Sequence, residues 1–269
     1  MLEVLQYEFM RNALVAGLLA AAACGVVGVY VVVKRIVFVS GGIAHASFGG
    51  IGLGYFLGIN PILGALFFAL GSGLALGGLT RRTRLADDTV IGVLWAMGMA
   101  LGVVLIALTP GYAPDLMTYL FGNILTVPFG DLVLMAILDL VIIGVVVALY
   151  KEFLVLSFDE EYATAVGIPV EKLYLLLMAM VALTIVVLIR VVGMILVIAL
   201  LTFPAAMARQ FTHSMKAMMV LSVLFGSVFT MGGLWLSYVL RLPSGATIIL
   251  LAGSALIVTL VVSRLHIRR

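Results

Sequence analysis

The sequence is divided into nine apolar runs, each close to the length that a helix needs to cross a bilayer. A transmembrane helix needs about 20 mostly apolar residues. The runs occupy residues 12–33, 39–58, 61–79, 89–108, 129–149, 172–190, 193–210, 217–240 and 244–263. We therefore predict an all-α, polytopic integral membrane protein with about nine transmembrane helices, forming one transmembrane domain over residues 1–269.

Eight spans are the alternative, because two of the connections are very short. Only Asn60 and Pro61 separate the second run from the third, and a tight turn near Gly193 separates the sixth from the seventh. A helical hairpin produces this pattern, and so does a broken or re-entrant segment.

The composition agrees with a membrane protein. Hydrophobic residues make up 65% of the chain and charged residues only 10%, whereas a soluble domain is typically about 45–50% apolar and about 25% charged. The net charge of +3 comes from lysines and arginines in short clusters between the runs. We interpret these clusters as signals of topology and predict no nucleic-acid partner.

The same clusters predict the orientation. With nine spans, one side receives Lys34 and Arg35, the arginines at 81–84, the lysines at 151 and 172, and those at 209–216 and 264–269. Cytoplasmic loops carry an excess of Lys and Arg. The N-terminus is therefore expected outside and the C-terminus in the cytoplasm.

Motifs for ATP hydrolysis and for tight metal binding are missing from the sequence. There is no Gly-x-x-x-x-Gly-Lys-Ser/Thr phosphate loop and no His-Glu-x-x-His motif. His45 is the only histidine within a predicted span, and Asp139 is a mid-span aspartate. These side chains are too few for an intramembrane enzyme, so we predict a protein that is not an enzyme and holds no tightly bound cofactor.

The segment 40–54 combines many glycines with His45. Residues four apart share a helix face, so Gly41 and Gly49 lie above and below His45 and are expected to leave open space around the imidazole. An ionisable residue within a span usually faces a cavity or a partner. His45 is therefore a candidate for a substrate path; the alternative is a packed histidine that bonds to a neighbouring carbonyl. A second row, Gly50, Gly54 and Gly58, is predicted to pack against another helix.

Two loops are long enough to carry structure of their own. The outer loop 109–128 has prolines around the apolar run 116–125 and predicts a short helix that lies at the outer surface or dips into it. The inner loop 150–171 predicts a separate helix at about 157–168. Ser157 or Asp159 can cap it, and the sequence Gly167-Ile-Pro ends it.

Three stretches together resemble the membrane permease subunit of ABC importers for zinc, manganese or iron ions. The first is Ser40–Gly58 around His45, the second is Ser157–Gly167, and the third is Val192–Ala206, a Gly-Met-Ile-Leu-Val run that ends in Pro-Ala-Ala. The resemblance covers residues 12–263, nearly the whole chain.

The resemblance implies a set of partners and a cargo. It implies a homodimeric pathway in the inner membrane of a bacterium or archaeon, a separate ATPase that binds the ATP, and an extracytoplasmic metal-binding protein. The predicted helix at about 157–168 would be the coupling helix, and it would contact the ATPase through the residues Asp159, Glu160, Glu161, Ala163 and Gly167. The cargo would be a divalent transition-metal ion held transiently by His45.

One departure from that family bears on the metal. Many members carry an aspartate four residues before the histidine, and here that position is Gly41. Imidazole suits zinc, whereas carboxylate oxygen suits manganese, so the sequence favours zinc. A secondary transporter driven by an ion gradient is the alternative function, since such proteins often have spans broken by Gly or Pro.

Overall fold

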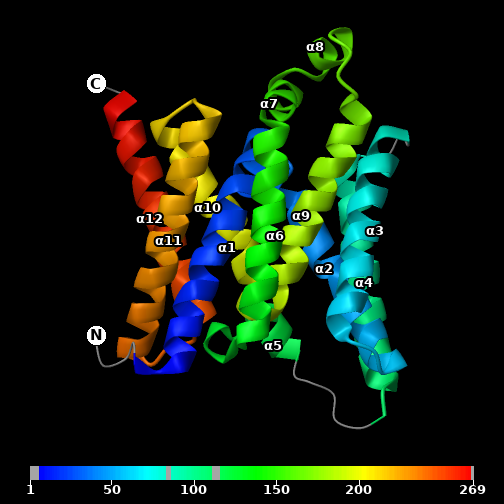
Figure 1. The fold of residues 1–269 in the computed structure, drawn as a ribbon, viewed down its shortest axis with the longest axis vertical. Helices are drawn as coiled ribbons and strands as arrows, with labels where there is room; N and C mark the ends of the chain where they lie inside the picture. Colours follow the sequence, from blue (N-terminus) through cyan, green and yellow to red (C-terminus); the bar gives the residue numbers. More distant parts are fainter. Residues whose placement is uncertain (1–5, 83–85, 111–115, 268–269) are drawn as a thin grey trace.

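The computed structural model describes residues 6–82, 86–110 and 116–267, and these residues form a bundle of long helices that run roughly side by side (Figure 1). The long helices are α1 (Glu8–Val33), α2 (Val37–Leu57), α3 (Pro61–Arg82), α4 (Asp87–Leu108), α6 (Phe129–Ala148), α9 (Val170–Val192), α10 (Met194–Phe211), α11 (Met215–Leu240) and α12 (Ser244–Ile267). The short ones are α5 (Leu116–Phe121), η2 (Ile124–Thr126), α7 (Tyr150–Phe158) and α8 (Glu160–Ala165).

The prediction of nine spans is confirmed. Nine helices of the described residues are long and apolar enough to cross a membrane, and each agrees with a predicted run to within about one helical turn. The helices α2 and α3 are separate, as are α9 and α10, so the alternative of eight spans is wrong.

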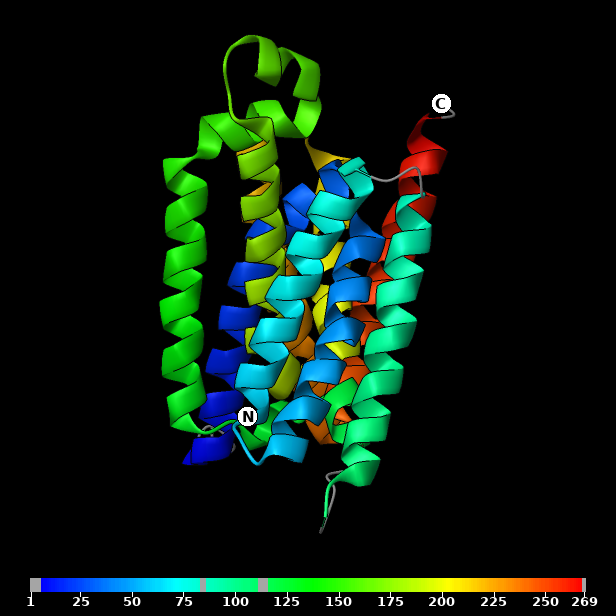
Figure 2. The same cartoon turned by 90° about the vertical axis from the view of Figure 1, so that its right-hand side faces the viewer.

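The helix α2 lies between α3 and α4, and it makes its most extensive contacts with these two. On the other side of the bundle, α1 packs against α10 and α11, which in turn pack against α12. The helix α9 joins the two groups through its contacts with α3, α2 and α1. The helix α6 lies at the front of the bundle in Figure 1 and stands at its edge in Figure 2.

The glycines of α2 allow the backbones of its neighbours to approach closely. A Cβ atom on Gly50 would collide with the carbonyl group of Gly64 in α3, and one on Gly54 would lie 2.5 Å from the Cα atom of Pro61. One turn before Gly50 on α2, the Cα atom of Ala46 would lie 2.5 Å from a Cβ atom on Gly98 of α4. The abundance of glycine in α2 therefore reflects its central position.

Gly58 does not belong to this packing row. A Cβ atom there would meet nothing within 4 Å, and Gly58 ends α2 in the left-handed conformation with φ 68°. Glycine is favoured at such a C-terminal position because it has no Cβ. The expectation of helix packing at Gly58 is corrected to helix termination.

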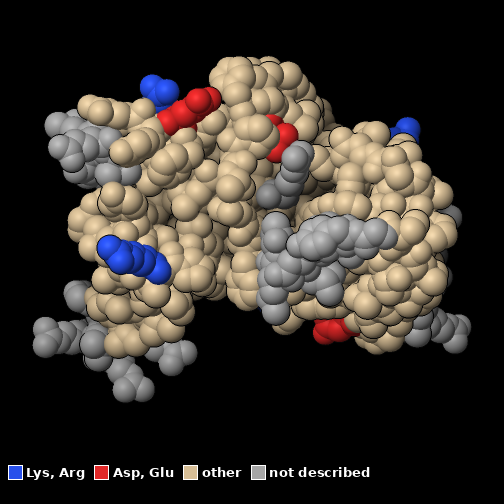
Figure 3. Space-filling model, turned by 90° about the horizontal axis from the view of Figure 1, so that it is seen from below, with Lys and Arg blue, Asp and Glu red and all other residues tan. Residues whose placement is uncertain are grey.

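The two ends of the bundle differ in structure and in charge. At one end lie α7, α8 and the C-terminal end of α12; at the other lie α5, η2 and the start of α1 (Figure 1). The α8 end carries Lys34, Lys151, Lys172 and Lys216. The opposite end shows only scattered charges among its described residues (Figure 3).

Candidate functional site

His45 lies partly exposed on α2 and is stacked against a tryptophan of α4. The rings of His45 and Trp95 have centroids 4.0 Å apart and planes only 11° from parallel. The Nδ1 atom of His45 is buried and makes no hydrogen bond. Stacking covers one face of the imidazole but leaves the lone pairs of the ring in its plane. The stack therefore fixes the orientation of a group that can still bind a ligand.

The expectation of open space around His45 is wrong. A Cβ atom on Gly41 would lie 3.3 Å from the Cζ3 atom of Trp95, and one on Gly49 would lie 3.0 Å from the ring of Phe68. Aromatic side chains from neighbouring helices occupy the room that these two glycines leave. One side of the imidazole is therefore closed by Trp95, which is itself 37% exposed.

The described residues contain no group of three or more His, Cys, Asp or Glu side chains that could hold a metal ion. Asp139 is buried, and its Oδ2 atom has no hydrogen-bond partner. It lies on α6, which packs mainly on α1 and α9 and makes no substantial contact with α2. The fold therefore does not bring Asp139 to His45, and among the described residues His45 belongs to no such group of metal ligands.

A polar pocket lies at the other end of α2 from Lys34. The hydroxyl groups of Tyr55 in α2 and Tyr119 in α5 are 2.5 Å apart and share a hydrogen bond. They line a cavity of about 250 Å³ together with Asn60 and Ala65. The separation of Tyr55 from His45 is ten residues, or about 15 Å along the helix axis.

The outer loop was predicted to form a short helix, and α5 and η2 lie within it.

The inner loop forms two helices, α7 and α8, where one was predicted. The carboxylate of Asp159 accepts a hydrogen bond of 2.8 Å from the backbone N–H of Tyr162 and so caps α8. Ser157 instead belongs to α7, where its hydroxyl donates to the carbonyl of Phe153. The buried face of the pair comprises Phe153, Leu156 and Ala163.

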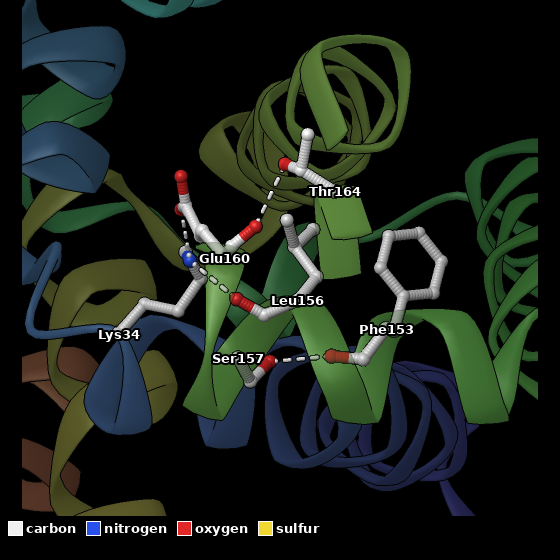
Figure 4. Close-up of polar contacts among 6 residues, drawn as sticks. All are labelled: Lys34, Phe153, Leu156, Ser157, Glu160 and Thr164. Carbon is white, nitrogen blue, oxygen red and sulfur yellow. Dashed lines mark hydrogen bonds and ion pairs between the residues drawn. The ribbon is translucent and has the colours of Figure 1, made fainter. Parts of the chain in front are cut away.

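An ion pair fixes α8 to the loop between α1 and α2 (Figure 4). The ammonium group of Lys34 lies 2.8 Å from the carboxylate of Glu160 and donates a second hydrogen bond of 2.9 Å to the carbonyl of Leu156. The side chain of Lys34 is only 9% exposed, whereas that of Glu160 is 40% exposed. Lys34 thus helps to hold the α7–α8 pair on the bundle, beside the buried side chains Phe153, Leu156 and Ala163.

Three large apolar side chains of the α7–α8 segment are exposed. Phe158, Tyr162 and Val166 are each more than half exposed and are spaced four residues apart; we call them the α8 ridge. The exposed acids Asp159 and Glu161 lie beside the ridge. Because Ala163 is buried within this chain, it seats α8 and does not face outward as its place in the predicted contact set implied. Gly167 follows α8 with φ 82° and has open space around it.

Comparison with known proteins identifies the family. Residues 6–263 match the family described as the ABC 3 transport family. The chain belongs to the ABC 3 transport family. The match spans all nine membrane helices together with α7 and α8, in agreement with the resemblance noted in the sequence.

Several relatives of this ABC 3 chain match over most of their length. An uncharacterized membrane protein of Synechocystis sp. is 52% identical, and the match covers 98% of this chain and 94% of the relative. The manganese transport system membrane protein MntC of Listeria monocytogenes is 35% identical, covering 93% and 89%. The solved structure of PsaBC from Streptococcus pneumoniae in complex with Fab matches with a TM-score of 0.86 and 31% identity, covering 95% and 92%.

Two residues of the candidate site were not predicted from the sequence. Trp95 lies within an apolar run, and nothing in the spacing of that run indicates that its ring meets His45. Lys34 was interpreted only as a topology signal. It is the one lysine in the short loop between α1 and α2, and the structure places this loop beneath α8. Each depends on a contact between segments more than 45 residues apart in the chain.

Proposed function

We propose that this chain is the membrane-spanning permease subunit of an ATP-driven importer for divalent transition-metal ions, with zinc preferred. The proposal is carried by the membership of the ABC 3 transport family over residues 6–263. Relatives named as manganese transport proteins support a metal as the cargo. In the proposed assembly, two copies of the chain face each other, and His45 of each copy lines the pathway.

The choice of metal follows from the donor atoms. His45 supplies imidazole nitrogen without a carboxylate four residues before it, because that position is Gly41, and Trp95 stands over it. Nitrogen ligands suit zinc, whereas manganese prefers oxygen. Two imidazoles and water would bind an ion weakly enough to release it. Preference for manganese, which the named relatives transport, is the outcome that would reject this part of the proposal.

The remaining tasks belong to partners. The sequence has no phosphate loop, so a separate ATPase would bind beneath each copy. The α8 ridge suits that contact, because it combines three exposed apolar side chains with the acids Asp159 and Glu161. An extracytoplasmic metal-binding protein would deliver the ion at the opposite end, near residues 109–128.

The Lys34 bridge supplies a route from the ATPase to the cargo. A movement of α8 displaces Glu160, to which Lys34 is bound. Lys34 ends α1, and α2 begins three residues later at Val37. Displacement of this loop moves the helix that carries His45, so ATP-driven rocking at the α8 end would alternate access to the imidazole.

Co-purification and uptake test the proposal together. The chain should bring down an ATPase subunit, and the reconstituted complex should take up zinc only with ATP. Tyr162→Ala should weaken ATPase binding by about 30-fold, since tyrosines are enriched among the few interface residues whose truncation costs about 2 kcal/mol or more.

Tyr238→Ala is the matched control, because Tyr238 is 55% exposed and Tyr162 is 57% exposed, but Tyr238 lies at the other end of the bundle. It should leave ATPase binding unchanged. Uptake without an ATPase, driven by an ion gradient, would reject the ABC mechanism and favour a secondary transporter.

Cysteine labelling tests the proposed orientation. In a background lacking Cys24, Glu161→Cys should resist a membrane-impermeant thiol reagent in intact cells, because α8 is assigned to the cytoplasm. Gly130→Cys, at the opposite end of the bundle, should react readily. Both should react after the membrane is disrupted. Labelling of position 161 but not position 130 in intact cells would show that the orientation is the reverse of the one proposed.

A further inference from the structure

A groove between α6 and α11 opens toward the lipid at the α8 end of the bundle. Both helices pack against α1 but make no substantial contact with each other, and Figure 1 shows α1 between them. The groove has a volume of about 720 Å³, within the range of about 300–1,000 Å³ typical of small-molecule sites. It is not part of the metal path, because neither wall belongs to α2 or α4.

The walls of the groove are apolar and the end is cationic. Val146, Val147, Met219 and Val220 line it within the membrane-spanning helices, and Lys151 and Lys216 stand at its end. The ammonium group of Lys216 lies 5.0 Å from the centroid of the Tyr150 ring. The side chain of Lys216 therefore extends from α11 across the groove to α7. Glu152 also lines the groove. The two lysines and this glutamate together give the groove a net charge of +1.

The first turn of α11 adds donors to the same place. Ser214 precedes the helix and makes no capping hydrogen bond with its side chain. The first N–H groups of a helix have no partner within the helix and favour an anion. Lys216, Met219 and Val220, all from the first two turns of α11, line the groove.

The groove continues as apolar surface along the membrane. Val220, Leu224 and Val228 form an exposed stripe on α11, and Leu140 and Val147 are more than 70% exposed on α6. A ligand for this site would therefore combine a phosphate group at the lysines with hydrocarbon along the helices. Basic pockets between transmembrane helices on the cytoplasmic side are suited to anionic lipid headgroups.

We propose that this groove binds one anionic phospholipid, with its phosphate between Lys151 and Lys216 and its acyl chains along α6 and α11. The leaflet is the one at the α8 end, which is cytoplasmic in the orientation proposed above. The lipid would occupy the space between α6 and the rest of the bundle and so stabilise the position of α6, from which α7 and α8 follow in the chain.

Lipid binding to the delipidated full-length chain tests this proposal, with native mass spectrometry and the shift of the thermal unfolding midpoint as readouts. Phosphatidylglycerol should be retained at one molecule per chain, and phosphatidylcholine should be retained more weakly. Lys151→Gln with Lys216→Gln should reduce retention of phosphatidylglycerol by about 25-fold, since each basic residue contributes about 1 kcal/mol near an anionic surface, which is about fivefold.

Two further variants separate charge from shape. Lys172→Gln removes an exposed lysine from the same end of the bundle and should have no effect, because Lys172 lies in a different depression beside Glu160, Glu161 and Glu171. Val147→Trp fills the groove without changing its charge and should abolish specific retention.

Four results would overturn the proposal. They are equal retention of phosphatidylglycerol and phosphatidylcholine, equal effects of the lysine pair and of Lys172→Gln, full competition by glycerol phosphate without acyl chains, and no retained lipid. None of these measurements depends on metal transport, so the lipid site and the proposed function can fail separately.

Discussion

Replacing His45 by alanine is expected to lower metal uptake by about 100-fold per folded complex. Changes to groups that merely orient a metal ligand typically reduce metal affinity or activity by about 10–100-fold, and loss of the imidazole itself belongs at the upper end of that range. The same substitution removes the stack with Trp95, but an aromatic pair contributes only about 0.5–1.5 kcal/mol beyond its buried area. The protein should therefore still fold.

The measurement is uptake of zinc by the reconstituted complex, normalised to the amount that elutes as a single folded species. His213→Ala is the control, because His213 is an exposed histidine outside the membrane helices. His45→Asp should restore part of the uptake and shift the preference toward manganese, since carboxylate oxygen suits that ion. Normal uptake by His45→Ala, combined with lower stability, would show that His45 has a packing role alone.

The second large effect is expected from adding one methyl group at Gly50. A Cβ atom there would collide with the backbone of Gly64, and it would lie 2.8 Å from the backbone nitrogen of Ala65. Overpacking usually costs about 1–3 kcal/mol. Gly50→Ala belongs at or above the top of that range, because backbone atoms of a neighbouring helix cannot rotate away as a side chain can.

Gly71→Ala provides the comparison for Gly50→Ala. Gly71 is also a helical glycine, in α3, but a Cβ atom there would meet nothing within 4 Å. Alanine is favoured over glycine within a helix by about 0.5–1 kcal/mol, so Gly71→Ala should be neutral or slightly stabilising. The thermal unfolding midpoint should fall for purified Gly50→Ala and should stay the same or rise slightly for purified Gly71→Ala. Equal shifts would indicate that α2 and α3 can separate without loss.

The membrane helices could be predicted from the sequence because each is a local property. An apolar run of about 20 residues identifies itself without reference to any other part of the chain. The break between α2 and α3 was ambiguous because Asn60 and Pro61 suit a hairpin and a re-entrant turn equally. The structure resolves this ambiguity through packing, since Gly50 and Gly64 bring the two helices together along their length.

The site was predicted only where a single residue type carried the signal. A histidine among glycines within an apolar run is unusual by itself, so His45 could be selected. Its environment could not be predicted, because Trp95 reaches it from another helix and fills the space above Gly41. Likewise, the cap at Asp159 is local and could be predicted, whereas the burial of Ala163 depends on how α8 rests on the bundle.

The bridge between Lys34 and Glu160 has a thermodynamic consequence for the proposed transporter. Coupling between two binding equilibria is reciprocal: if an ATPase bound at α8 changes the affinity for an ion at His45 by some factor, the ion changes the affinity for the ATPase by the same factor. Typical coupling free energies are about 1–3 kcal/mol. An empty and a loaded permease should therefore hold the ATPase with measurably different strength, and neutralising Lys34 should make the two strengths converge.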